Sequence, residues 1–236
     1  MANFFEIDFI AIDNAKSGDA IPIRYGIEGR TYIHVVDGGY QDTGKKVVDH
    51  IREHYGNPSF IDHVVATHPD GDHAGGLRKV LEEFDVGVLW MHRPWLYTEE
   101  LIGRFSRFTN VENLRARLRD IYPNIVALEE IADEKGIEIR EAFQGTVIGA
   151  FMVMAPTKIR YLELVIQSEK SPEATKEVVP QVGLGSLISS GVNRLVTLAK
   201  SVWGAEIFST GETSSENEMS IVQLSDVSTY GTDLRY

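Results

Sequence analysis

The amino-acid sequence predicts an α/β fold with a mixed sheet, and two observations support this prediction. Residues 61–91 contain four segments in succession: a buried apolar run, a glycine-containing turn, a segment with helical apolar spacing and a second apolar run. This is the order of an α/β layer. In addition, 43% of the 236 residues are hydrophobic, enough for a sizeable core. We therefore expect one domain over residues 1–236.

The expected strands share short apolar or alternating runs bounded by turn residues, and they lie at 4–12, 20–25, 31–36, 61–66, 86–91, 145–155 and 220–224. Residues 26–29 are expected to form a hairpin turn. The expected helices share apolar residues three or four positions apart, and they lie at 44–55, 75–84, 98–121 and 184–202. Residues 109–112 indicate a new helix start within the third of these. The remaining predictions are acidic surface at 129–141 and polar loops at 168–181 and 210–218.

Composition excludes several classes of protein. The formal charge of −12 argues against a broadly basic nucleic-acid-binding face, although it allows a local one. No run of about 18 uncharged apolar residues occurs, so we expect no membrane partner. The first residues lack the basic and apolar pattern of a signal peptide, which favours a cytoplasmic location. The absence of cysteine excludes thiolate ligands and disulfides, and nothing in the sequence indicates an oligomeric state.

The segment Thr-His-Pro-Asp-Gly-Asp-His-Ala-Gly-Gly-Leu at residues 67–77 carries the clearest functional signal. It places His68, Asp70, Asp72 and His73 within six residues, directly after an expected buried strand. Imidazole and carboxylate groups are ligands of divalent metals. The alternative is a polar turn that caps the following helix, but one His and one Asp would suffice for that. The turn therefore predicts a metal site.

This turn resembles the H-x-H-x-D-H signature of the metallo-β-lactamase-fold hydrolases, with Asp70 in place of the second His. It is most similar to the variant found in the hydrolase domain of bacterial competence (DNA-uptake) channel proteins. Residues 12–20, 36–39 and 216–224 resemble other turns and a strand of that branch. The resemblance implies a four-layer αββα sandwich of metallo-β-lactamase type. It covers residues 4–95 and returns weakly after 206, which leaves 96–205 as a divergent insert or cap.

The resemblance also implies roles for the motif residues. His68 and Asp70 would serve one metal, and Asp72 and His73 a second. Because the Asp70 carboxylate is a harder ligand than imidazole, metal preference shifts from zinc towards manganese, magnesium or iron. We expect manganese or zinc as the cofactor, with two ions in the full-length protein. Asp72 is the predicted catalytic residue, since it could orient a water made acidic by the metal.

Acidic residues on neighbouring turns are further candidates. Asp13, Asp19 and Asp37 lie on turns that the fold brings near the site. They would either orient the ligand histidines or stabilise their own turns, and the sequence leaves both interpretations open.

Two ligand positions of the family have no match in this sequence. The bridging Asp of a T-G-D turn and the last His of an H-H-G-S turn are absent, and all seven histidines lie at or before His92. We therefore expect the chain to be truncated at its C-terminal side, and inactive or nearly so by itself. His92 could act as a substitute ligand, but a packed or substrate-facing His is the favoured interpretation.

Three functions remain open from the sequence. The first is a metal-dependent hydrolase of phosphodiester bonds, perhaps a nuclease, with a small phosphodiester or nucleic acid as substrate. The second is hydrolysis of a small ester, lactone or thioester, because this fold is shared by many chemistries. The third is a non-catalytic interaction domain that retains the fold. The aromatic segment 90–95 and the five arginines at 104, 107, 115, 117 and 119 could contact phosphates, or could be a pocket rim and a solvated helix face.

Overall fold

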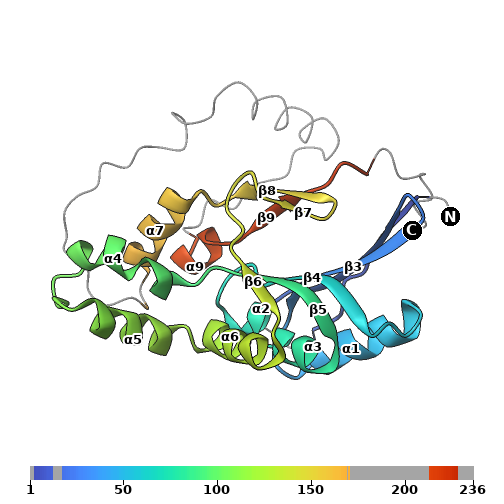
Figure 1. Cartoon of the computed structure of the whole chain (residues 1–236), viewed down its shortest axis with the longest axis horizontal. Coiled ribbons are helices and arrows are strands. Elements are labelled where there is room, and N and C mark those ends of the chain that lie inside the picture. Colours follow the sequence, from blue (N-terminus) through green and yellow to red (C-terminus); the bar gives the residue numbers. More distant parts are fainter. Residues whose placement is uncertain (1–2, 13–17, 169, 171–212, 228–236) are drawn as a thin grey trace. The chain divides into compact units, whose positions relative to one another are not determined.

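The computed structural model describes residues 3–12, 18–168, 170 and 213–227 (Figure 1). Apart from Thr213, these residues belong to one compact unit. The strands are β1 (Phe4–Ile7), β2 (Ala20–Ile27), β3 (Arg30–Gly38), β4 (Phe60–Val65), β5 (Asp85–Trp90), β6 (Glu138–Arg140), β7 (Val147–Ile148), β8 (Phe151–Ala155) and β9 (Val222–Leu224). The α-helices are α1 (Thr43–His54), α2 (Gly71–Ala74), α3 (Leu77–Glu83), α4 (Thr98–Leu101), α5 (Val111–Ile121), α6 (Pro123–Lys135), α7 (Lys158–Gln167) and α9 (Ser215–Glu218). Two short 3-10 helices are η1 (Pro94–Tyr97) and η2 (Ile102–Arg104).

A six-stranded mixed sheet positions the site. Its strand order is β1-β2-β3-β4-β5-β6, with β1, β2 and β3 antiparallel and β3 to β6 parallel. The β2–β3 hairpin turns at Glu28 and Gly29, which both have positive φ, as tight hairpin turns of two residues require. Because β3, β4 and β5 are parallel, their carboxyl ends meet at one edge of the sheet, where α/β proteins place their functional groups.

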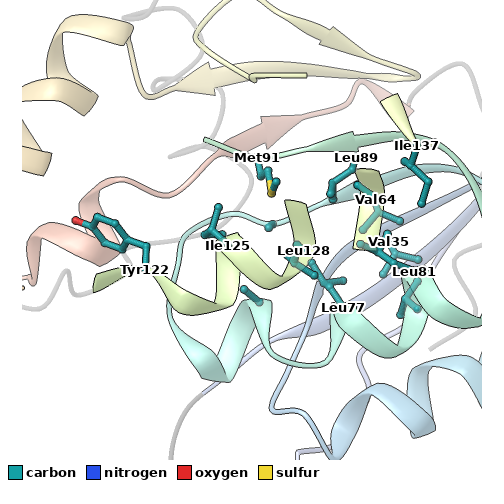
Figure 2. Close-up of a cluster of buried hydrophobic side chains, with 14 of the residues drawn as sticks. Val35, Val64, Leu77, Leu81, Leu89, Met91, Tyr122, Ile125, Leu128 and Ile137 are labelled. Carbon is teal, nitrogen blue, oxygen red and sulfur yellow. The ribbon is translucent and has the colours of Figure 1, made fainter. Parts of the chain in front are cut away.

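Helices cover one face of this sheet. Figure 1 shows α1, α3 and α6 along the same side, and Figure 2 shows apolar side chains between α3, α6 and the strands. Val35, Val64 and Leu89 from the strands meet Leu77 and Leu81 of α3, and all five are fully buried. The amphipathic pattern of α1 and α3 that predicted helices therefore produces the main core.

The opposite face of the sheet packs against a second, three-stranded sheet of order β7-β8-β9. Val65 and Trp90 of the first sheet are buried together with Ile148, Val153 and Ile221. Two packed sheets with helices on the far side of one of them confirm the predicted α/β fold class. Within the described ranges, the helices are too short or too polar to cross a bilayer.

Several local predictions are confirmed and others are wrong. The predicted helix start at 109–112 is confirmed, since the Asn110 side chain accepts hydrogen bonds from the backbone N–H groups of Glu112 and Asn113. The single strand predicted at 145–155 is instead the β7–β8 hairpin, because Gly149 takes a positive φ and turns the chain. The loop predicted at 210–218 contains α9, with Ser214 as its cap. The apolar segment 184–202 lies outside the described residues.

The prediction of acidic surface at 129–141 is confirmed for Glu130, Asp133, Glu134 and Glu138, which are exposed, and is wrong for Glu129. Glu129 lies on α6 and is buried, and it accepts hydrogen bonds from Trp95 Nε1 at 3.2 Å and Arg93 Nη1 at 3.1 Å. Arg119 completes the group with a third contact to the same carboxylate. Charge alone predicts exposure, but three donors from other elements offset the cost of burying this carboxylate.

A buried histidine between the two sheets makes stability dependent on pH. His34 on β3 is fully buried against Phe151, with 4.6 Å between the ring centroids. Burial and the neighbouring His63 lower the pKa of His34 to about 3, and Gln223 offsets only part of this. Below pH ~6.5 the unfolded chain therefore binds a proton that the folded chain excludes, so stability should fall by about 1.4 kcal/mol per pH unit from this group.

A His34→Phe variant tests this expectation by urea unfolding between pH 7.5 and 5. We call the unsubstituted protein the parent chain. The free energy of unfolding of the variant should change with pH less steeply than that of the parent chain, by about 1.4 kcal/mol per pH unit. His54→Gln, at an exposed position on α1, is the matched control and should keep the full slope. Identical slopes in the parent chain and His34→Phe would show that His34 is not the group responsible.

Candidate metal centre

The motif lies at the carboxyl end of β4, beside the end of β3. Residues 66–70 form the loop after β4, Asp70 directly precedes α2 without a side-chain hydrogen bond to it, and Asp72 and His73 lie on this single helical turn. Asp37 projects from the last part of β3 into the same space. One potential ligand atom each from Asp37, His68 and His73 lies within 4.8 Å of those of the other two. The structure thus brings the two predicted histidines together with Asp37 from another strand.

A chain of hydrogen bonds determines which nitrogen of each histidine carries the proton. Asp37 accepts from the backbone N–H of Thr67 at 2.8 Å and from its hydroxyl at 2.6 Å. Since the hydroxyl proton of Thr67 goes to Asp37, its oxygen can only accept from His68 Nδ1, which lies 2.9 Å away. Asp37 Oδ2 is also 2.9 Å from His73 Nδ1, which must donate to the carboxylate. In their neutral forms both imidazoles therefore hold the proton on Nδ1, where His68 also lies 3.2 Å from Ser220 Oγ, and both Nε2 atoms keep a lone pair.

The free lone pairs suit a metal ion. His68 Nε2 is buried and has no hydrogen-bond partner among the described residues. The ring centroids of His68 and His73 are 4.0 Å apart. His73 Nε2 lies 3.9 Å from Asp72 Oδ2, so the two could bind a common ion. A carboxylate that holds Nδ1–H while Nε2 remains available is the usual support of a metal-binding histidine. This arrangement favours the orienting role for Asp37.

The electrostatic environment differs between the two histidines. Burial, together with the neighbouring His73, lowers the pKa of His68. For His73 burial acts in the same direction, but the hydrogen bond and charge of Asp37, with the charges of Asp72 and Asp19, raise its pKa overall. His68 is therefore held neutral, the form in which imidazole binds a metal.

Glycines allow the motif to lie against β3. A Cβ atom on Gly76 would stand 1.9 Å from the carbonyl oxygen of Gly38, and the Gly76 N–H donates to the carbonyl of Gly39 at 2.8 Å. No side chain fits at that approach. Asp37 itself has φ of +55°, an uncommon conformation for a residue with a side chain. The Gly-Gly pair of the motif thus fixes α2 and α3 against the turn that carries Asp37.

The remaining acidic candidates lie at the edge of this group. Asp19 is exposed, with its carboxylate 3.8 Å from His73 Nδ1, and its backbone N–H donates to the carbonyl of Asp72 at 3.3 Å. Asp70 is not part of the Asp37–His68–His73 group, and its carboxylate instead contacts Lys170. Asp13 lies outside the described residues. Sequence reasoning assigned no role to Lys170, because no pattern connects it with a motif 100 positions away.

His92 is a packed residue. Its ring stacks on Phe143 with 4.3 Å between centroids and lies 4.6 Å from Tyr161. Burial lowers the pKa of His92 to about 3, and the backbone of Ala142 offsets only part of this. It lines a small cavity of about 10 Å³, also lined by Ala66, Thr67, His68, Pro69, Pro94, Tyr122, Ile125, Tyr161 and Met219. Such a cavity accommodates about one water and no organic substrate.

The aromatic and arginine segments mainly serve the fold. Trp95 is buried and donates to Glu129, and the Arg119 guanidinium lies 5.0 Å from the centre of the Trp95 ring. On α5, Arg115 pairs with Glu112 at 2.6 Å. These pairs within the chain favour the interpretation of a solvated helix face, with its arginines paired to neighbouring carboxylates, for this part of the arginine segment.

Comparisons with known proteins identify one family and several similar solved structures. A family model, the metallo-beta-lactamase superfamily, matches residues 25–146, more than half of the 236 residues and all of the motif. Among solved structures, the metallo-β-lactamase SMB-1 bound to 2-mercaptoethanesulfonate is similar at 14% identity and a TM-score of 0.35, covering 62% of this chain and 49% of that one.

A metallo-β-lactamase from Hirschia baltica is similar at 11% identity and a TM-score of 0.30, covering 64% of this chain and 55% of that one. This chain thus spans about half the length of these two proteins. No curated protein sequence matches it. By the family match over residues 25–146, the chain belongs to the metallo-β-lactamase superfamily.

Proposed function

We propose that this chain is a metal-dependent hydrolase domain that binds manganese or zinc and acts on phosphodiester bonds. The observation that supports it most is the hydrogen-bond chain through Thr67 and Asp37, which directs the proton of each neutral imidazole to Nδ1 and leaves Nε2 of His68 and His73 available to a metal. Family membership supports the same activity. The phosphodiester preference rests on the similarity of the motif, with Asp70 in place of the second His, to the competence-type variant.

Each residue has a distinct part in this proposal. Nε2 of His68, Nε2 of His73 and the Asp72 carboxylate would hold the ion, and Asp37 keeps both imidazoles in the required tautomer through its hydrogen bonds. A divalent ion held there supplies a Lewis acid that makes a nearby water more acidic. Asp72, with about a quarter of its side chain exposed, would orient that water and accept its proton.

Metal binding is the first test. The parent chain should bind one manganese or zinc ion per chain, measured by elemental analysis after dialysis. The bound ion should raise the midpoint temperature of thermal unfolding. His68→Ala and His73→Ala should each abolish the thermal shift. His50→Ala, a histidine paired with Asp8 on the surface of α1, is the matched control and should keep it. A parent chain without metal would contradict the proposal.

Turnover is the second test. With manganese, the parent chain should hydrolyse bis-p-nitrophenyl phosphate faster than p-nitrophenyl acetate or a simple lactone, at a low rate because two ligand positions of the family have no match in this sequence. Asp72→Ala should lower the rate by a factor of about 100 or more, the usual contribution of a general base. Faster turnover of the ester or lactone would support the second function left open by the sequence. A metal-loaded chain that turns over none of these substrates would support the non-catalytic interaction domain.

A further inference from the structure

The ion pair between Lys170 and Asp70 has no part in the function proposed above. Lys170 Nζ contacts Asp70 Oδ1, and the two residues are 100 positions apart in the sequence. Asp70 is the position where the resemblance places a metal ligand, yet its carboxylate is directed to this ammonium group rather than to the histidines.

The lysine is held in place by its neighbours. Its backbone N–H donates to Ser168 Oγ at 3.1 Å, and the hydroxyl of Ser168 donates to Glu216. Both Ser168 and Glu216 are buried, and Glu216 belongs to α9. The chain after α7 is thus attached to α9 at the point from which Lys170 reaches the metal centre.

The charges around the centre explain why a cation is useful there. Asp19, Asp37, Asp70 and Asp72 all lie in or beside the motif, and their mutual repulsion favours any bound positive charge. A lysine ammonium supplies one such charge permanently, without a coordination geometry to satisfy.

We propose that Lys170 competes with the divalent ion for Asp70, so that Asp70 joins the metal ligands only when the lysine leaves it. This inference rests on the metal site proposed above. Lys170 is then a positioning residue that sets metal affinity, because a metal that recruits Asp70 must first break this ion pair. Hard ions, which gain most from a further carboxylate, should be affected more than zinc.

Manganese titration of four proteins tests the proposal: the parent chain, Lys170→Met, Asp70→Asn and the double variant. Lys170→Met should bind manganese about fivefold more tightly, the factor that corresponds to an exposed ion pair of about 1 kcal/mol. The double variant should bind no more tightly than Asp70→Asn, because the freed carboxylate is then absent. Lys158→Met, which breaks an exposed pair with Glu100 at the start of α7, is the matched control and should change nothing.

The outcomes separate this inference from the proposed function. If the parent chain binds manganese and Lys170→Met binds it equally or more weakly, the competition is refuted while the metal site stands. If Lys170→Met binds manganese and the parent chain does not, the competition is supported, while the metal binding proposed for the parent chain fails. If neither protein binds manganese or zinc, both proposals fail.

Discussion

Replacement of Glu129 by Ala should lower the free energy of unfolding by about 3–5 kcal/mol, the cost of leaving a buried charge without its partner. The Glu129 side chain is only 10% exposed, and its carboxylate meets two guanidinium groups and the indole N–H of Trp95. The variant leaves Arg93 without its carboxylate partner. Because the Arg93 side chain is only 18% exposed, water can solvate its guanidinium only in part. Urea unfolding at pH 7.5 measures the change.

The adjacent residue supplies the control for this prediction. Glu130 is 64% exposed and lies 4.0 Å from Arg119, so Glu130→Ala should cost less than about 1 kcal/mol. Glu129→Gln keeps one acceptor oxygen, so its loss in free energy of unfolding should fall between those of Glu129→Ala and Glu130→Ala. Equal stabilities for Glu129→Ala and Glu130→Ala would show that the buried group of charges adds nothing to the fold.

Replacement of Asp37 by Ala should both destabilise the chain and abolish metal binding. The carboxylate is 2% exposed and accepts three hydrogen bonds, two from Thr67 and one from His73. Each buried donor left unpaired costs about 1–3 kcal/mol, so the free energy of unfolding should fall by about 3 kcal/mol or more. The positive φ adds to this cost, because Ala adopts it less readily than Asp.

Two further variants separate the role of Asp37 in the fold from its role at the site. Asp37→Asn tolerates the backbone conformation and keeps one acceptor oxygen, so it should recover part of the stability. It should still bind metal more weakly than the parent chain, because the amide carries no negative charge to support His73. In either orientation its NH2 group also faces a donor, which is the N–H of Thr67 in one and Thr67 Oγ1 with His73 Nδ1 in the other. Asp19→Ala removes an exposed carboxylate beside the same histidine and should leave stability nearly unchanged. Unfolding with and without zinc measures both effects, and an undiminished zinc shift in Asp37→Ala would contradict the orienting role.

The sequence predicted the elements near the site well, because local patterns determine them. Alternation and apolar runs located β2 to β5, and helical spacing located α1 and α3, each within a few residues of the observed bounds. It failed where distant partners decide the outcome. Glu129 was assigned to the surface because its burial depends on Arg93 and Arg119, which approach it from other elements. The β7–β8 hairpin was taken for one strand because the positive φ of Gly149 leaves no mark on the apolar pattern.

The sequence by itself determined the α/β class and the set of ligand-type side chains at 68, 70, 72 and 73, since four such groups in six residues are a local property. Only the tertiary structure decided how they are used. It brought Asp37 of β3 to His73 and to Thr67, and it turned Asp70 towards Lys170. These contacts join residues 30 to 100 positions apart, and their geometry depends on parallel strand packing and on Gly76 against Gly38. Proton positions on the histidines follow from those contacts, and no pattern within the motif contains them.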